Sequence, residues 1–170
     1  MRTTIRCAIV SKRNWHTLRI DEDKDVAKEF QQVEWDAKLE DDCRQLVRLA
    51  IREDLDRGMD VTTLALVPAE SAGQAAVVAR QAGVIAGLRA AEIVLDEMEI
   101  DADWQMPVND GTVVEPGTEV AKFTGQARDL LTAERLLLNL LGRLSGVATL
   151  ARQYTQLVAH TKARVYDTRK

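Results

Sequence analysis

The 170 residues suit one ordinary domain, or a domain with part of a second, and a content of 46% hydrophobic and 29% charged residues is typical of a soluble globular protein and not of a disordered chain. No apolar run is long enough to span a bilayer, and the two cysteines lack CxxC or metal-ligand spacing, so we expect a cytoplasmic protein with free thiols. Residues 1–123 carry 15 Lys/Arg and 24 Asp/Glu, a net charge of −9, whereas residues 124–170 carry 8 Lys/Arg and 3 Asp/Glu, a net charge of +5. The basic section would attract nucleic acid, phosphates or carboxylates. An uneven distribution of surface charge with no function would give the same counts.

The first third of the chain predicts a flexible extension followed by one helix. Residues 1–34 show no amphipathic period and contain a run of mixed charge, so we expect a flexible segment. Residues 36–55 then carry apolar side chains at helical spacing: Leu39, Cys43, Leu46, Val47, Ala50 and Leu55. Asp36 can cap this helix, because its side-chain oxygen accepts an unpaired backbone N–H. A loop from Met59 to Pro68 is expected next.

Alternating and apolar segments predict strands around a second helix. Gln74–Arg80 is rich in small and β-branched residues and predicts a strand, and Val84–Ala86 is a short apolar run. Leu88–Glu99 has helical spacing. Further on, Thr112–Val114 and Glu119–Thr124 flank the turn dipeptide Pro-Gly, so we expect an antiparallel pair of strands.

The C-terminal part is dominated by leucine. Residues 129–160 predict a long helix that is apolar nearly all round and therefore buried on several sides, with a break near Ser145-Gly146. Ala163–Asp167 predicts a strand. A strand with no following element to cover it indicates an incomplete fold.

Polar and small residues form a single stripe on this leucine helix. Their spacing alternates between three and four, which places them on one face: Arg128, Thr132, Arg135, Asn139, Gly142, Gly146 and Thr149. The stripe is either the solvated face of the helix or a surface that points Arg135 and Asn139 into a cleft. Arginine would suit a carboxylate or phosphate there, because its planar guanidinium offers paired donors and keeps its charge.

Several segments match the motifs of a known family in order and spacing. Glu134–Leu141 resembles E-R-T-x-L-N-x-L, Leu144–Thr149 resembles L-S-G-I-A-T, and Asp167–Lys170 resembles D-T-R-K. Upstream, Glu53 to Thr63 resembles E-D-x-G-x-G-D-x-T-T. Over residues 36–170 the chain is identified by these motifs as resembling the quinolinate phosphoribosyltransferases. It departs from them at Leu136, Met59, the extension 1–34 and its ending, since the family continues with T-P-G-x-R and a barrel.

The resemblance implies an α+β fold. Residues 35–128 would form a small α/β sandwich, an antiparallel sheet with helices. Residues 129–170 would form a long helix and the first strand of an incomplete α/β barrel.

The resemblance also implies a pentosyltransferase of NAD biosynthesis. Such enzymes transfer phosphoribosyl from phosphoribosyl pyrophosphate to quinolinate and release carbon dioxide, which gives nicotinate mononucleotide. Mg²⁺ would be bound through the pyrophosphate, with no protein metal site, no nucleic acid and no membrane partner. Arg135 would enter the site of a partner subunit in a homodimer, and Arg169 and Lys170 would bind quinolinate and phosphate groups. Asn139 and Glu134 are supporting candidates.

Three alternatives remain open at this point. The chain could be a non-catalytic fragment or half of a split enzyme, because one barrel strand cannot enclose both substrates. It could be a related phosphoribosyltransferase with another acceptor. A remote third reading is a lipoyl- or biotinyl-like carrier, whose modified lysine sits at a hairpin tip; Lys122 lies away from any such tip.

Overall fold

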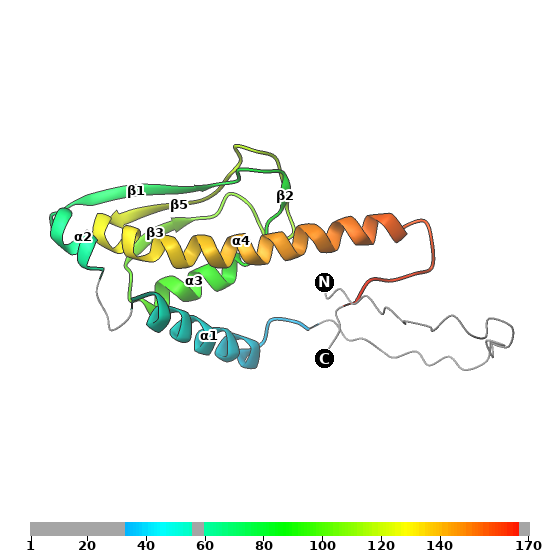
Figure 1. The fold of residues 1–170 in the computed structure, drawn as a ribbon, viewed down its shortest axis with the longest axis horizontal. Helices are drawn as coiled ribbons and strands as arrows, with labels where there is room; N and C mark the ends of the chain where they lie inside the picture. The colour runs from blue at the N-terminus through cyan, green and yellow to red at the C-terminus, as the bar shows by residue number, and fades with distance from the viewer. Residues whose placement is uncertain (1–32, 56–59, 167–170) are drawn as a thin grey trace, which may run out of the picture.

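The computed structural model describes residues 33–55 and 60–166, which form a sheet backed by helices (Figure 1). The fold is α+β, as expected. The elements in chain order are α1 (Ala37–Leu55), α2 (Val61–Leu66), β1 (Ala72–Val78), β2 (Gly83–Val84), α3 (Leu88–Glu97), β3 (Ala102–Gln105), β4 (Val113–Val114), β5 (Glu119–Gln126) and α4 (Ala127–Val158). Helices α3 and α4 pack together, α4 also contacts β1 and β5, and α1 lies outside α3. The C-terminal turns of α4 extend past the sheet.

Two small antiparallel sheets organise the strands. The larger has the order β1-β5-β3, and the smaller pairs β2 with β4. The expected pairing of Val113–Val114 with the strand after Pro-Gly is therefore wrong. The turn itself forms, since the Thr118 N–H donates to the Glu115 carbonyl at 3.1 Å and Gly117 has a φ of 89°. After this turn, β5 pairs with the seven-residue β1, which is a longer partner than the two-residue β4.

Two elements, α2 and β3, are not predicted from the sequence. The predicted loop 59–68 is helical over α2, where the Asp60 carboxylate caps the helix by accepting the Thr63 N–H at 3.0 Å. Six residues are too few to display a helical period. Strand β3 was not expected either, because its sequence, Ala-Asp-Trp-Gln, lacks β-branched residues.

Helix α1 begins where its cap predicts. The Asp36 carboxylate accepts the Leu39 N–H at 2.7 Å. Only Val47 of α1 is buried, and Leu46 of the predicted apolar face is 68% exposed. Cys43 is a free thiol, whereas Cys7 lies outside the described residues, as do residues 1–32 of the segment 1–34 that is predicted to be flexible.

Helix α4 is continuous, so the predicted break near Ser145-Gly146 is wrong. A glycine lowers helix stability by only about 1 kcal/mol, which packing on the domain outweighs here. The predicted strand 163–167 is reduced to one bridge residue, Tyr166, among the residues described, and Asp167 lies outside them.

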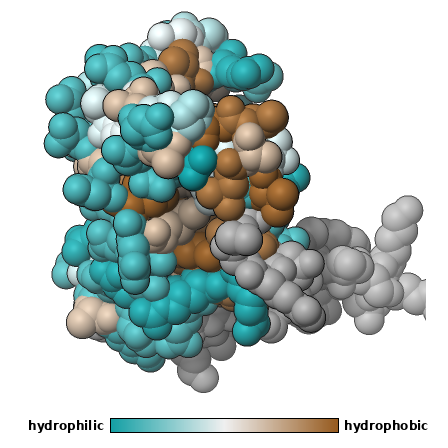
Figure 2. Space-filling view, turned by 90° about the vertical axis from the view of Figure 1, so that its left-hand side faces the viewer, coloured by the Kyte–Doolittle hydropathy of each residue, from teal (hydrophilic) through white to brown (hydrophobic). Residues whose placement is uncertain are grey.

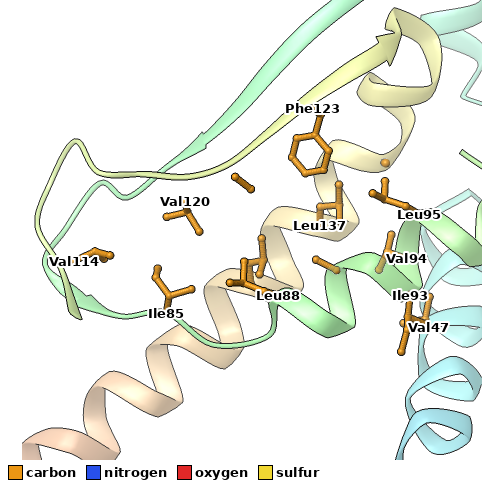
Figure 3. Packing of buried hydrophobic residues seen from close by; sticks show 14 residues of the cluster. Val47, Ile85, Leu88, Ile93, Val94, Leu95, Val114, Val120, Phe123 and Leu137 are labelled. Carbon is orange, nitrogen blue, oxygen red and sulfur yellow. The ribbon is translucent and has the colours of Figure 1, made fainter. Parts of the chain in front are cut away.

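The core lies between α3, α4 and the larger sheet (Figure 3). Val94 and Ala91 are fully covered, and Phe123 of β5 and Leu137 of α4 belong to the same buried cluster. Val47 of α1 is buried and packs against Ile93 of α3 (Figure 3). This core fixes the orientation of α4 and therefore which of its faces is exposed.

Candidate functional site

Two ends of the predicted α4 stripe hold the domain together. Arg128 donates from Nε to the Val67 carbonyl at 2.8 Å and from Nη2 to the Leu64 carbonyl at 3.1 Å, which satisfies the C-terminal carbonyls of α2. Thr149 Oγ1 accepts the Val84 N–H at 2.8 Å. Both side chains therefore already have hydrogen-bond partners within the domain.

The middle of the stripe is open to solvent. Arg135 is 73% exposed at its side chain, and Asn139 is exposed one turn further along the same face. A Cβ added at Gly142 or Gly146 would meet nothing within 4 Å, so the helix backbone itself is accessible there. The structure thus brings Arg135 and Asn139 together beside bare helix surface.

Arg135 makes one ion pair within its own domain. Its Nη1 lies 2.9 Å from Oδ1 of Asp54, the carboxylate in the last turn of α1. Asp54 is only 16% exposed, whereas the guanidinium remains largely in solvent. Glu134, the predicted supporting carboxylate, has no hydrogen bond to Arg135 among the described residues, because adjacent helix positions point in different directions. Arg169 and Lys170 lie outside the described residues.

A groove of about 610 Å³ runs beside the open part of the stripe. One wall is the β1–β2 connection around Arg80, and the other is α4 at Gly142, Gly146 and Gln153. Its lining is mostly apolar, with polar groups at the edges. Neither this groove nor Asp54 was singled out from the sequence as part of a site; the only signal was that Asp54 falls within the E-D motif.

An ion-pair network fixes α1, and with it Asp54, on α3. Arg44 Nη1 donates to Glu97 Oε1 at 2.9 Å, Arg44 Nη2 donates to Asp96 at 3.1 Å, and Arg48 binds the same Glu97 carboxylate. Hydrogen bonds from Arg48 and Arg44 lower the pKa of Glu97 below its usual value of 4.5. The network adds to the packing of Val47, Cys43 and Ile51 of α1 against the core.

The described residues contain no group of three or more His, Cys, Asp or Glu side chains that could hold a metal ion. Lys122 lies within β5, paired with Ala76 on one side and Gln105 on the other, and is not at a hairpin tip. That position does not fit a lipoyl or biotinyl attachment site. No helix in the described part is apolar and long enough to cross a membrane.

Large apolar side chains are exposed on three helices. They include Leu46 and Leu49 on α1, Val61, Leu64 and Leu66 on α2, and Leu131 and Leu138 on α4. Figure 2 shows hydrophobic atoms lying side by side on one flank of the molecule, with hydrophilic surface above and below. A contiguous apolar surface of this kind is typical of a protein contact.

The comparisons with known proteins agree on one family. A model of the quinolinate phosphoribosyl transferase N-terminal domain matches residues 60–145. The chain is 41% identical over 132 residues to the nicotinate-nucleotide pyrophosphorylase [carboxylating] of Mycobacterium leprae, a match covering 76% of this chain and 46% of the relative. It is 35% identical over 129 residues to quinolinate phosphoribosyltransferase [decarboxylating] 2b of Nicotiana tabacum, covering 76% and 36%.

Solved structures give the same result. The nicotinate-nucleotide pyrophosphorylase of Francisella tularensis superposes with a TM-score of 0.67 at 26% identity, over 72% of this chain and 44% of that one. NadC from Streptococcus pyogenes does so with a TM-score of 0.67 at 29% identity, over 75% and 44%.

Residues 60–145, from α2 into α4, therefore belong to the N-terminal domain of a phosphoribosyltransferase. The chain belongs to the quinolinate phosphoribosyltransferase family. It spans less than half the length of the curated relatives it matches.

Proposed function

We propose that this chain supplies part of the active site for transfer of phosphoribosyl from phosphoribosyl pyrophosphate to quinolinate, with loss of carbon dioxide, to give nicotinate mononucleotide. The observation that carries the proposal is the exposed guanidinium of Arg135 on the leucine-rich helix α4, inside the segment that matches the family. The names of the relatives supply the reaction.

The chemistry of the substrates calls for such a group. A dicarboxylate and a phosphorylated sugar must both leave water, and fixed cations offset that cost. Arg135 would bind a carboxylate or phosphate oxygen through the donors that face solvent. Asn139 would add an amide donor one turn away, and Gly142 and Gly146 would allow a ligand or a second backbone to approach α4 closely.

Mg²⁺ fits the reaction as a partner of the substrate. Bound to the pyrophosphate oxygens, it would neutralise negative charge on the leaving group. Among the described residues near Arg135, the mostly covered carboxylate of Asp54 is already paired with a guanidinium. The residues on this face are thus suited to bind anions, and the pyrophosphate oxygens would bind the Mg²⁺.

A second subunit is part of the proposal. Arg135 points out of its own domain, and the exposed leucines of α2 and α4 lie on neighbouring surface. A homodimer in which this face meets the partner's site would cover both features. Arg169 and Lys170 are proposed to bind quinolinate and phosphate groups. Residues 35–128 would form the sandwich domain and residues 129–170 would start the barrel domain. The proposed location of the protein is the cytoplasm.

A chimera tests the function directly. Residues 1–166 of this chain would be joined in frame, at the matched position, to the remaining C-terminal part of the Mycobacterium leprae relative. With Mg²⁺, we expect the chimera to form nicotinate mononucleotide from quinolinate and phosphoribosyl pyrophosphate. The 170-residue chain alone is expected to form none. Nicotinate offered in place of quinolinate tests the alternative acceptor.

Substitutions in the chimera locate the site. Arg135→Ala should lower kcat/KM by about 100-fold, the order expected for removing one partner of a charged hydrogen bond. Arg152→Ala is the matched control, because Arg152 is another exposed arginine of α4 on a different face. A folded, dimeric chimera that lacks activity, or that keeps full activity without Arg135, would refute the proposal.

A further inference from the structure

The contact between Asp54 and Arg135 joins two segments that are 81 residues apart in the sequence. Asp54 comes from the last turn of α1 and Arg135 from the third turn of α4. The carboxylate is mostly covered, at 16% exposed, while the guanidinium it contacts is 73% exposed. The Asp54 carboxylate therefore lies on the inner side of the ion pair, and the Arg135 guanidinium lies on the solvent side.

The geometry leaves most of the guanidinium available. Arginine has five N–H donors, and Asp54 takes one of them at Nη1. The Nε and Nη2 groups have no hydrogen-bond partner among the residues described, so they can bind an anion without breaking the ion pair. A bidentate pair would have occupied the fork and competed with a ligand.

The anchoring of α1 makes Asp54 a fixed point. Val47 is buried against α3, and Arg44 and Arg48 hold the Glu97 carboxylate from the same helix. An unrestrained arginine loses several rotamers on binding a ligand, which weakens binding. A fixed carboxylate behind the guanidinium removes part of that loss before the ligand arrives.

We propose that Asp54 is a positioning residue that orients Arg135 toward its anionic ligand. The proposal rests on the proposed function, in which Arg135 binds quinolinate or a phosphate group. Asp54 touches Arg135 and not the reacting atoms. Its removal should therefore weaken substrate binding more than it slows the chemical step.

Kinetics of the chimera test this role. Asp54→Ala should raise KM for quinolinate or phosphoribosyl pyrophosphate by about three- to tenfold, the effect expected from freeing one rotamer-rich side chain, with kcat within about twofold. Asp54→Asn keeps the side-chain volume and an acceptor and should have a smaller effect, which covers the case in which the alanine variant fails to fold. Asp41→Ala is the matched control, since Asp41 is an exposed aspartate of α1 whose carboxylate is hydrogen-bonded within that helix, to Gln45.

A double-mutant cycle separates positioning from a general structural role. In the Arg135→Ala background, Asp54→Ala should have no further effect on KM. An equal effect in both backgrounds, or a KM that falls when Asp54 is removed, would overturn the proposal. If Arg135→Ala itself leaves kcat/KM unchanged, the proposed function fails instead, and the two failures are distinguishable.

The isolated chain supplies a readout that needs no activity. NMR relaxation of the Arg135 Nε–H group reports the order of the guanidinium. We expect this group to become more mobile in Asp54→Ala and to stay unchanged in Asp41→Ala. Equal mobility in the parent chain and in Asp54→Ala would overturn the proposal.

Discussion

Ser145, in the middle of α4, hydrogen-bonds both backbone groups of Ala86. Its Oγ accepts the Ala86 N–H at 3.0 Å and also contacts the Ala86 carbonyl oxygen at 3.3 Å. Thr149, one turn later, accepts the Val84 N–H in the same way. The chain between β2 and α3 thus uses the side chains of α4 to satisfy its backbone.

Removing that hydroxyl should destabilise the domain. Ser145→Ala leaves the Ala86 N–H and carbonyl without this partner, and we expect the free energy of unfolding to fall by about 1–3 kcal/mol in urea denaturation. Thr155→Ala is the control, because among the described residues the Thr155 hydroxyl bonds only to the Ala151 carbonyl of its own helix, at an exposed position. A similar loss in both variants would contradict the assigned role of Ser145.

Two glycines should respond oppositely to alanine. Gly87 has a φ of 102°, and a Cβ there would lie 2.5 Å from Cδ1 of Leu144, so Gly87→Ala should destabilise the domain by about 1–2 kcal/mol or more. Gly142 is an exposed helix position with open space around it, and Gly142→Ala should stabilise by about 0.5–1 kcal/mol. Thermal unfolding of the two variants side by side checks the sign of each effect.

Arg128 and Arg135 lie on the same stripe but should differ in stability effects. Arg128→Ala removes two hydrogen bonds to α2 carbonyls, and we expect a loss of about 1–3 kcal/mol. Arg135→Ala should change stability by less than about 0.5–1 kcal/mol, since its guanidinium is 73% exposed. Urea unfolding of both, with Arg152→Ala as reference, tests this division; equal losses would contradict it.

The network between α1 and α3 should be sensitive to acid. Because the folded pKa of Glu97 lies below its usual 4.5, its ionised form is favoured by folding. This contribution is fully present above about pH 4.5 and is lost as the pH falls through the lowered pKa. Glu97→Gln should therefore be less stable than the parent at pH 7, and the difference should shrink toward pH 3.

The control for this prediction is Glu115→Gln, at an exposed turn position. Unfolding midpoints at several pH values should show no comparable pH-dependent difference for that variant. A Glu97→Gln deficit that stays constant from pH 7 to pH 3 would show that the carboxylate charge is not responsible.

Local patterns were sufficient to place the long helices and the turns. They were wrong about the break in α4 and about its burial on several sides, since only Ala133, Leu137 and Leu141 of this helix are buried. The cap at Asp36 and the glycine at position 117 act over three or four residues, so their effects are readable from the sequence. The six residues of α2 and the four of β3 were missed because short elements are stabilised by their neighbours more than by their own pattern. Arg128, for example, reaches α2 from 61 residues away.

The sequence by itself determined the family, the α+β class and the arginine stripe on α4, because motif order and helical spacing are properties of the chain alone. Only the tertiary structure decided which residues of the α4 stripe stay exposed and which bond to their own domain. Arg128 and Thr149 are committed to their own domain, whereas Arg135 stays exposed beside Asp54. The physical reason is that a partner is selected by packing between distant segments, and spacing within one helix carries no information about it.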